Sequence, residues 1–208
     1  MKLIEMQVQE FVNILRSDAP APGGGSSAAL AGAMGIGLGE MVAGLTLGKA
    51  KYAEFEETMK TLQAEAARLT DALIASVDKD TEAFDGVSAV FGMPKSNDEE
   101  KAARREAMQK ALKTATMVPF SVMELCLESL ETLEKGLGKI NMNAASDFGV
   151  ASLNLKAAVQ GAWLNVCINI GGIKDEAFVA EYRSKGEAIL AKALPLADKI
   201  YNTILESL

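Results

Sequence analysis

A long, uninterrupted helical pattern constrains the fold more than any other feature of this sequence. From about Ala53 to Phe91 the chain contains no proline, and apolar residues recur at steps of three and four. No region shows the period-two alternation of several strands, so we expect an all-α, single-domain bundle of long helices over residues 1–208. The expected helices span about residues 3–16, 26–46, 53–91, 98–135, 146–170 and 174–208, with a kink or restart at Pro119 and a kink near Pro195.

The composition excludes several classes of function. A formal net charge of −7 argues against a nucleic-acid partner, whose phosphates require a basic surface. The chain contains no histidine, which removes the usual Ser-His-Asp and Cys-His nucleophiles and the commonest zinc ligand. We therefore expect no metal, and we expect any acid–base chemistry to fall to carboxylates, lysines, tyrosines or thiols.

The cysteines and the N-terminal stretch both bear on the cellular compartment of the protein. Cys126 and Cys167 lie in apolar runs without CxxC spacing, and we interpret both as small core residues. The N-terminal stretch is charged and amphipathic and lacks the pattern of a signal peptide, so the cytoplasm is the expected compartment.

Three consecutive glycines precede a serine and a helix of small residues. Gly24, Gly25 and Ser26 would offer free backbone N–H groups and the positive end of a helix dipole to an anion or a carbonyl oxygen, with Ser26 as the cap. The alternative is a tight connection between helices. In the helix that follows, the glycines at 32, 35, 39 and 44 permit close packing in a core or a dimer interface, which we favour over a membrane span because Glu40 interrupts it.

Two lysines follow that helix. Lys49 and Lys51 would suit the acidic tail of a ligand, but solvated lysines after a helix C-terminus are an equally good interpretation.

Asp80 interrupts an apolar seam of the long helix. It falls in register with Leu73, Val77, Phe84 and Val87, where the pattern requires an apolar side chain, whereas Asp78 does not. A carboxylate directed at the core is costly unless it is paired, and burial would raise its pKa as a general acid or base requires. A structural ion pair or buried hydrogen bond is the alternative.

A polar line follows the helix expected over residues 146–170. Asp147 and Asn165 are five helical turns apart and share a face, and Asn169 lies within about 40° of it. Small residues lie between them, so the line could hold a flat heterocycle rich in donors and acceptors. An internal hydrogen-bond ladder between helices is the alternative.

These motifs together resemble the cyclodeaminase/cyclohydrolase family of folate enzymes. The resemblance covers nearly the whole chain and is carried by the following segments in this order: 21–26 (APGGGS), 48–52 (GKAKY), 77–84 (VDKDTEAF), 93–95 (MPK), 99–101 (EEK), 118–119 (VP), Ser146-Asp147, 165–169 (NVCIN) and 175–178 (DEAF).

The resemblance implies a homodimeric helical enzyme with a folate site near the subunit interface, Asp80 as the catalytic residue and no cofactor beyond the tetrahydrofolate substrate. The implied reaction is cyclodeamination of 5-formiminotetrahydrofolate to 5,10-methenyltetrahydrofolate and ammonia. The alternative is hydrolysis of 5,10-methenyltetrahydrofolate to the 10-formyl compound. The expected ligands are tetrahydrofolate derivatives with or without polyglutamate tails, held by the glycine-rich segment, the two lysines, Ser146, Asp147 and the two asparagines. A helical folate-binding or interaction protein without catalysis is the third possibility.

Overall fold

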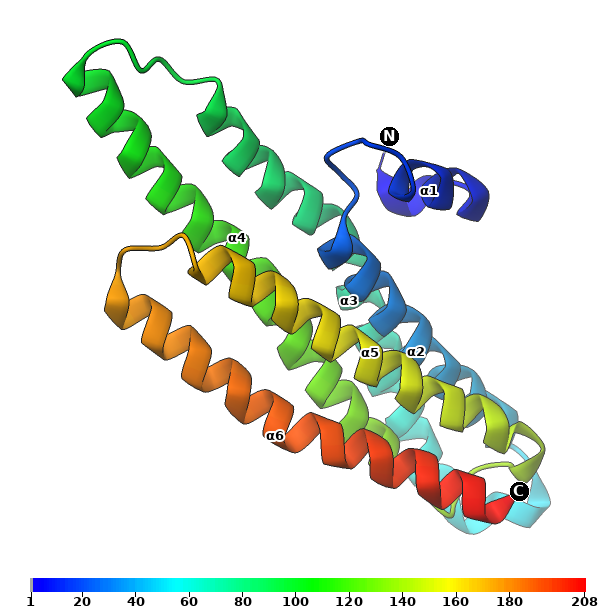
Figure 1. Ribbon diagram of the computed structural model, residues 1–208. Coiled ribbons are helices and arrows are strands. Elements are labelled where there is room, and N and C mark those ends of the chain that lie inside the picture. The colour runs from blue at the N-terminus through cyan, green and yellow to red at the C-terminus, as the bar shows by residue number, and fades with distance from the viewer. Residues whose placement is uncertain (1) are drawn as a thin grey trace.

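The computed structural model describes residues 2–208, and within them every regular element is a helix. The elements are η1 (Leu3–Glu5), α1 (Val8–Leu15), α2 (Gly24–Thr46), η2 (Ala50–Phe55), α3 (Glu56–Phe91), α4 (Asp98–Glu134), η3 (Met142–Ala144), α5 (Ala145–Ile170) and α6 (Glu176–Ser207). The long helices form an elongated bundle in which the α3–α4 hairpin extends beyond its neighbours as an arm (Figure 1). The predicted all-helical fold is confirmed.

Several expected boundaries were wrong. Helix α2 begins at Gly24 with Gly23 as its cap residue, so Ser26 lies inside the first turn and does not cap the helix. The N-terminal helix is divided into η1 and α1. Helix α4 continues through Pro119, so no new helix begins there, and α6 is continuous through Pro195, where no break was expected.

Helix α2 packs against α3 and α5 and supplies small residues at these contacts. A side-chain carbon on Gly35 would lie 2.9 Å from the carbonyl oxygen of Ala151 in α5, and one on Gly39 would overlap the Leu133 side chain in α4. Gly32 faces Leu73 and Cys126. These glycines therefore serve packing inside one chain, and α2, which by length and composition alone could cross a membrane, lies within the bundle.

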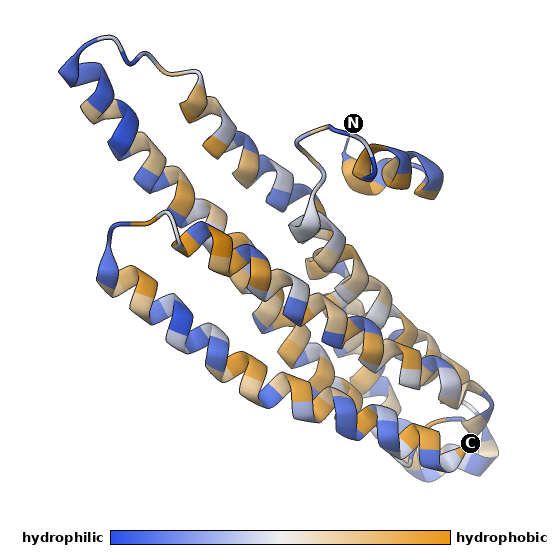
Figure 2. Ribbon diagram, viewed as in Figure 1, coloured by the Kyte–Doolittle hydropathy of each residue, from blue (hydrophilic) through white to orange (hydrophobic). Residues whose placement is uncertain are grey.

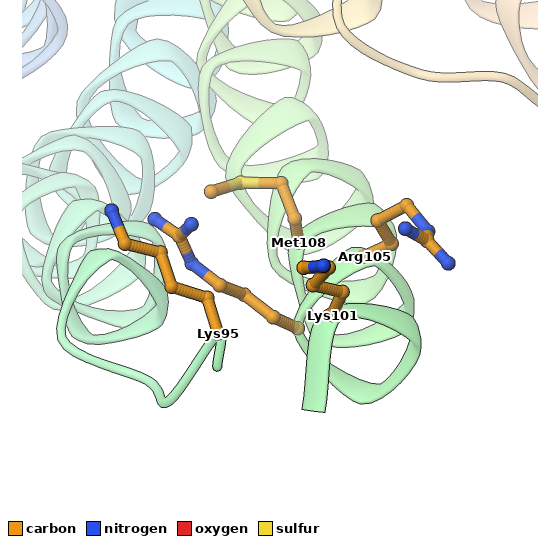
Figure 3. A pocket seen from close by; sticks show the side chains of 5 residues that line it. Lys95, Lys101, Arg105 and Met108 are labelled. Atoms are coloured by element: carbon orange, nitrogen blue, oxygen red, sulfur yellow. The ribbon is translucent and has the colours of Figure 1, made fainter. Parts of the chain in front are cut away.

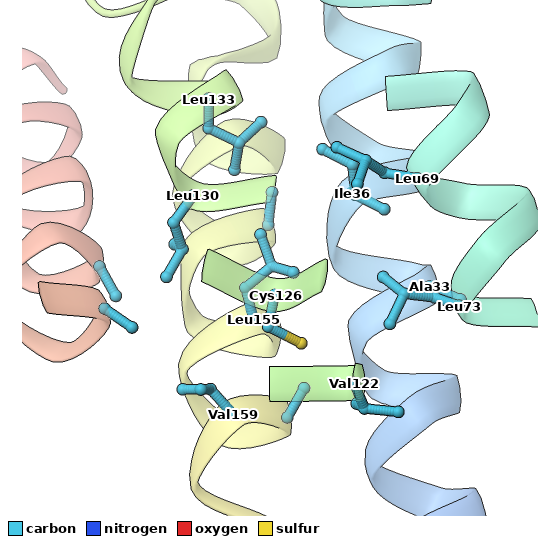
Figure 4. Packing of buried hydrophobic residues seen from close by; sticks show 14 of the residues in the cluster. Ala33, Ile36, Leu69, Leu73, Val122, Cys126, Leu130, Leu133, Leu155 and Val159 are labelled. Carbon is cyan, nitrogen blue, oxygen red and sulfur yellow. The ribbon is translucent and has the colours of Figure 1, made fainter. Parts of the chain in front are cut away.

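The core is a continuous apolar cluster to which α2, α3, α4, α5 and α6 contribute (Figure 4). Cys126 is fully buried in it, and desolvation raises the pKa of its thiol to about 12. This confirms its interpretation as a core residue, because only the thiolate is reactive. Cys167 is only half-buried and is not part of the core cluster, so its interpretation as a core residue was wrong.

The antiparallel course of α2 and α5 gives the bundle two distinct ends. The first turn of α2 and the last turn of α5 meet near the base of the arm, while the C-terminus of α2 meets the start of α5 at the opposite end. At that opposite end Asn141, just before α5, donates from its backbone to Thr46 (2.9 Å) and from its side chain to the Leu45 carbonyl (3.0 Å). Residues on these two helices can therefore share a face and still lie a bundle length apart.

Candidate active site

A pocket of about 400 Å³ opens where α2, α3, α4 and α5 meet at the base of the arm. Its wall is formed by Pro20, Ala21, Gly23, Gly24, Gly25, Asp80, Thr81, Ala83, Phe84, Val87, Leu112, Ala115, Asn165, Ile168 and Asn169. Asp80 is the single ionisable side chain among these residues. Any proton transfer within this pocket by a protein side chain of acidic or basic character must therefore involve Asp80.

Asp80 lies against the first turn of α2. The Ser26 hydroxyl donates to Oδ2 of Asp80 (3.0 Å), and the Ser26 backbone N–H also bonds to the carboxylate. A side-chain carbon on Gly25 would overlap the carboxylate, so only glycine permits this approach. The carboxylate thus satisfies one of the N–H groups that a helix N-terminus leaves without an intrahelical partner.

Opposing effects act on the pKa of Asp80. Desolvation by burial is the largest and raises the pKa, while the hydrogen bonds from the Ser26 side chain and backbone lower it. The net pKa is raised above its ordinary value, which eases proton uptake and release nearer neutral pH. The predicted direction is confirmed, and its cause is the predicted one.

The apolar seam around Asp80 is more exposed on the C-terminal side of it. Leu73 and Val77 are fully in the core, whereas Phe84 and Phe91 are 38% and 62% exposed, although Val87 between them is buried. Asp80 therefore marks the point where α3 leaves the core and begins to form the arm. Asp78 lies off the seam, as predicted, and its carboxylate accepts the backbone N–H of Leu3 (2.6 Å).

Two asparagine side chains from the end of α5 line the pocket. The amide nitrogen of Asn165 donates to the Gly161 carbonyl (2.9 Å), and that of Asn169 donates to the Ala115 carbonyl (2.8 Å). A carbonyl can only accept, so these bonds fix which end of each amide is nitrogen. The side-chain oxygens of both residues stay available as acceptors for a ligand.

Pro119 explains why Asn169 is held in this way. In a helix the N–H of residue 119 would bond to the carbonyl of Ala115, and proline has no N–H. The Asn169 amide supplies the missing donor. The proline inside α4 thereby orients a polar side chain of α5 at the pocket wall.

The remaining predicted ligand residues lie at the opposite end of the bundle. Lys49 and Lys51 flank the start of η2, and Ser146 and Asp147 occupy the first turn of α5. None of the four lines the pocket. From Asp147 to Asn165 the helix rises about 27 Å.

The predicted cradle between Asp147 and Asn165 is therefore wrong within one chain. The small residues between them contact α2, since a side-chain carbon on Gly161 would lie 3.2 Å from Cβ of Ala28. Helix α2 packs against these small residues, so no space for a heterocycle remains between Asp147 and Asn165. The apolar wall residues Leu112, Ala115 and Ile168 escaped the sequence analysis because nothing in a local pattern separates them from core positions.

Comparison with known proteins identifies the family. A family model described as Formiminotransferase-cyclodeaminase matches residues 7–188. The chain belongs to this family. It is 43% identical to the methenyltetrahydrofolate cyclohydrolase of Methylorubrum extorquens, over 95% of each chain. It is 34% identical to the formimidoyltransferase-cyclodeaminase of Gallus gallus, covering 92% of this chain but 35% of that protein. The crystal structure of formiminotetrahydrofolate cyclodeaminase from Thermotoga maritima superposes with a TM-score of 0.86 at 29% identity, over 97% of each chain.

We expect Asn169→Ala to lower the free energy of unfolding by about 1–3 kcal/mol, because it leaves the Ala115 carbonyl without a donor. Pro119→Ala in the same background should recover part of this loss, since residue 119 can then donate to Ala115. Urea unfolding of the two single variants and the double variant measures the coupling. Strictly additive effects would show that the proline and the asparagine act independently.

We expect Asp80→Asn to raise the free energy of unfolding at neutral pH. Because the folded-state pKa is raised, the folded protein binds more protons than the unfolded chain between the ordinary Asp pKa and the raised value. Wild-type stability therefore falls as pH rises through this window, so the advantage of Asn is complete above the window and disappears below it. Urea unfolding across this pH range tests the sign, with the exposed Asp85→Asn as the control for loss of one charge. An advantage independent of pH would contradict it.

Proposed function

We propose that this protein catalyses a one-carbon reaction on tetrahydrofolate, with Asp80 carrying the proton. Hydrolysis of 5,10-methenyltetrahydrofolate to 10-formyltetrahydrofolate is the first candidate. The cyclohydrolase relative at 43% identity matches over 95% of both chains. This reverses the order of preference drawn from the sequence, which put the deaminase first. We also infer that the protein works in the cytoplasm, without a metal, nucleic acid or membrane.

The raised pKa of Asp80 in a pocket with no other ionisable side chain is the observation that carries the proposal. The carboxylate accepts a proton from water as the water oxygen bonds to the methenyl carbon. The protonated carboxyl returns that proton to N5 as the carbon–N5 bond breaks, and the hydroxyl proton on the carbon leaves to solvent as the formyl group forms. One group thus serves both steps.

The neutral groups of the pocket suit a pterin ring. The Asn165 and Asn169 oxygens can accept hydrogen bonds from the ring N–H and amino groups, because their amide nitrogens are already committed. The backbone N–H groups of Gly24 and Gly25, in the first turn of α2, can donate to a ring carbonyl. Phe84 and Ile168 supply apolar surface for the faces of the ring.

Cyclodeamination of 5-formiminotetrahydrofolate is the second candidate. It is favoured by the likeness to the Thermotoga maritima cyclodeaminase over 97% of both chains. Here N10 attacks the carbon of the protonated formimino group (–CH=NH2+) and loses its proton to Asp80, which passes that proton to the nitrogen as the carbon–nitrogen bond breaks and ammonia leaves. The same carboxylate serves, so the two activities differ in the attacking and leaving groups and not in the shuttle.

We further infer that the protein is a homodimer through one face of α2 and α5. Apolar side chains recur on this face at helical steps and are 41–76% exposed: Met34, Met41 and Leu45 on α2, and Val150, Leu153, Leu164 and Ile168 on α5. No charged residue interrupts the series, and a monomer rarely exposes so continuous an apolar stripe.

An antiparallel pairing of this face is self-complementary, as two-fold symmetry requires. It would bring the end that holds Lys49, Lys51 and Asp147 in one copy toward the pocket of the other. Ile168 both lines the pocket and lies on the stripe, which supports a site beside the subunit interface. The four ligand residues that one chain keeps distant would then be contributed by a second copy.

We expect Asp80→Asn to retain folate binding and to lose at least about 10²-fold in turnover, because Asn keeps the shape but cannot shuttle a proton. Loss of methenyltetrahydrofolate absorbance and release of ammonia from formiminotetrahydrofolate measure the two activities. Asp78→Asn, which alters a carboxylate bound to the N-terminal segment, is the control. Near-wild-type turnover of Asp80→Asn would make the aspartate structural, and absence of both activities in the wild type would favour a binding protein.

We expect light scattering to give a dimer at micromolar concentration, and Leu164→Glu to give a monomer, because it places a charge on the apolar stripe. Val12→Glu is the matched control, since Val12 is also exposed (49%) but belongs to α1 and not to the stripe on α2 and α5. A monomeric wild type, or a dimer that survives Leu164→Glu, would contradict this interface.

A further inference from the structure

The Asp80 carboxylate is the inner end of a chain of two hydroxyl groups. The Ser26 hydroxyl donates to Oδ2 of Asp80 (3.0 Å), and its oxygen lies 3.3 Å from Oγ1 of Thr81. Ser26 is fully buried, whereas Thr81 is half-buried and lines the pocket. Thr81 shares a side of α3 with the exposed Asp85, four positions farther on. The chain therefore leads from Asp80 through a buried hydroxyl to one that water can reach.

The charge on Asp80 fixes the direction of both hydrogen bonds. A hydroxyl carries one hydrogen, and Ser26 gives its hydrogen to the carboxylate, so Thr81 must be the donor in the second contact. At 3.3 Å this contact is long, as catalytic hydrogen bonds often are before a ligand binds. While Asp80 is charged, both hydroxyl hydrogens thus point toward the carboxylate.

Protonation of Asp80 on Oδ2 reverses the chain. The carboxyl group then donates to Ser26, so the Ser26 hydroxyl turns to donate to Thr81 and the Thr81 hydroxyl turns to donate to water. From this arrangement each oxygen can pass its hydrogen to the next, and the last hydrogen goes to water. Both hydroxyls end with one hydrogen each, and the hydrogen bonds return to the directions that they have around the charged carboxylate.

The two candidate reactions differ in whether they release a proton. Hydrolysis adds water to the methenyl cation and gives a neutral formyl group, so one water proton goes to N5 and the other must leave the site. Cyclodeamination converts the protonated formimino group into the methenyl cation, and the N10 proton departs with ammonia. Only hydrolysis therefore produces a proton that the site must pass to solvent.

We propose that Thr81 is a positioning residue for Asp80 which, with Ser26, carries this second proton to solvent. The proposal rests on the proposed function, and within it on hydrolysis. After Asp80 has returned the first proton to N5, its carboxylate takes the proton of the hydroxyl group on the carbon. The electron pair of that O–H bond becomes the second carbon–oxygen bond of the formyl group. The chain of hydroxyls then delivers the proton to water and leaves the carboxylate ready for the next substrate.

Charged side chains of the same chain offer no alternative route from this pocket. Asp80 is the single ionisable residue of the pocket wall. Basic residues of the α3–α4 arm, Lys95, Lys101 and Arg105, stand near its tip and do not line the Asp80 pocket (Figure 3). A bound folate would cover Asp80 from the pocket side, whereas the contact with Ser26 lies on the side of α2.

Thr81→Val tests the relay, because valine has nearly the shape of threonine and lacks the hydroxyl. We expect kcat for hydrolysis of 5,10-methenyltetrahydrofolate to fall about tenfold or more, while the affinity for 5-formyltetrahydrofolate stays within about twofold of wild type. Imidazole buffer at rising concentration should restore kcat, after subtraction of the rate without enzyme, because a small base can take the proton from Asp80 directly. The wild type should not respond to the buffer. Thr81→Ala should behave like Thr81→Val, and Thr81→Ser should keep the wild-type kcat.

Thr70→Val is the matched control, because Thr70 is also a half-buried threonine of α3 and its hydroxyl donates to the Ala66 carbonyl (2.8 Å). It should keep kcat and show no response to imidazole. The relay is overturned by wild-type kcat in Thr81→Val, by a loss that imidazole does not restore, or by an equal loss in Thr81→Ser. A wild type that releases ammonia but does not hydrolyse overturns it as well, since that reaction yields no net proton. A wild type with neither activity overturns the proposed function itself.

Discussion

The contact between the Asp80 carboxylate and the first turn of α2 is the interaction on which the site depends. It requires glycine at position 25, because any side chain there would occupy the space of the carboxylate. It requires α2 to begin at Gly24, since only an N-terminal turn leaves N–H groups free for an acceptor. It also requires α2 and α3 to pack closely, which the small residues of α2 permit. A helix assembled from Gly, Ala and Ser is thus what brings a carboxylate and a helix N-terminus together.

This contact balances two opposing effects. Hydrogen bonds from Ser26 and the positive end of the helix dipole favour the charged carboxylate, while burial disfavours it. If the bonds alone acted, the pKa would fall and the carboxylate would be too weak a base to take up a proton. If burial alone acted, the pKa would rise and the carboxyl group would be too weak an acid to give the proton back. A residue that must accept and then donate one proton needs neither form to be strongly preferred, and in a chain without histidine this balance must be built from the surroundings of a carboxylate.

The sequence predicted the features that depend on helical periodicity. It did not predict which parts of two helices lie beside each other in the bundle. The helical fold and the placement of Asp80 follow from three- and four-residue steps, which are local. Periodicity also placed Asp147 and Asn165 on one face, five turns apart, but it does not tell that α2 covers the space between them. The start of α2 was missed for a related reason. Ser26 is a good cap by residue type, but its hydroxyl is bound to Asp80, a contact between residues 54 positions apart that no local pattern contains.

Within one chain, the charges are distributed so that no other ionisable side chain lines the pocket that holds Asp80. A lysine or arginine within hydrogen-bonding distance would stabilise the carboxylate and lower its pKa, cancelling the effect of burial. The pocket instead recognises its ligand with amides, backbone groups and apolar side chains, whereas polar residues gather at the tip of the arm (Figure 2). Arg105 lies about 10 Å along α4 from the pocket wall, which exceeds the screening length of about 8 Å at physiological ionic strength. Because no cation of the same chain lines the pocket, burial alone opposes the hydrogen bonds from Ser26, and the proton affinity of Asp80 stays intermediate.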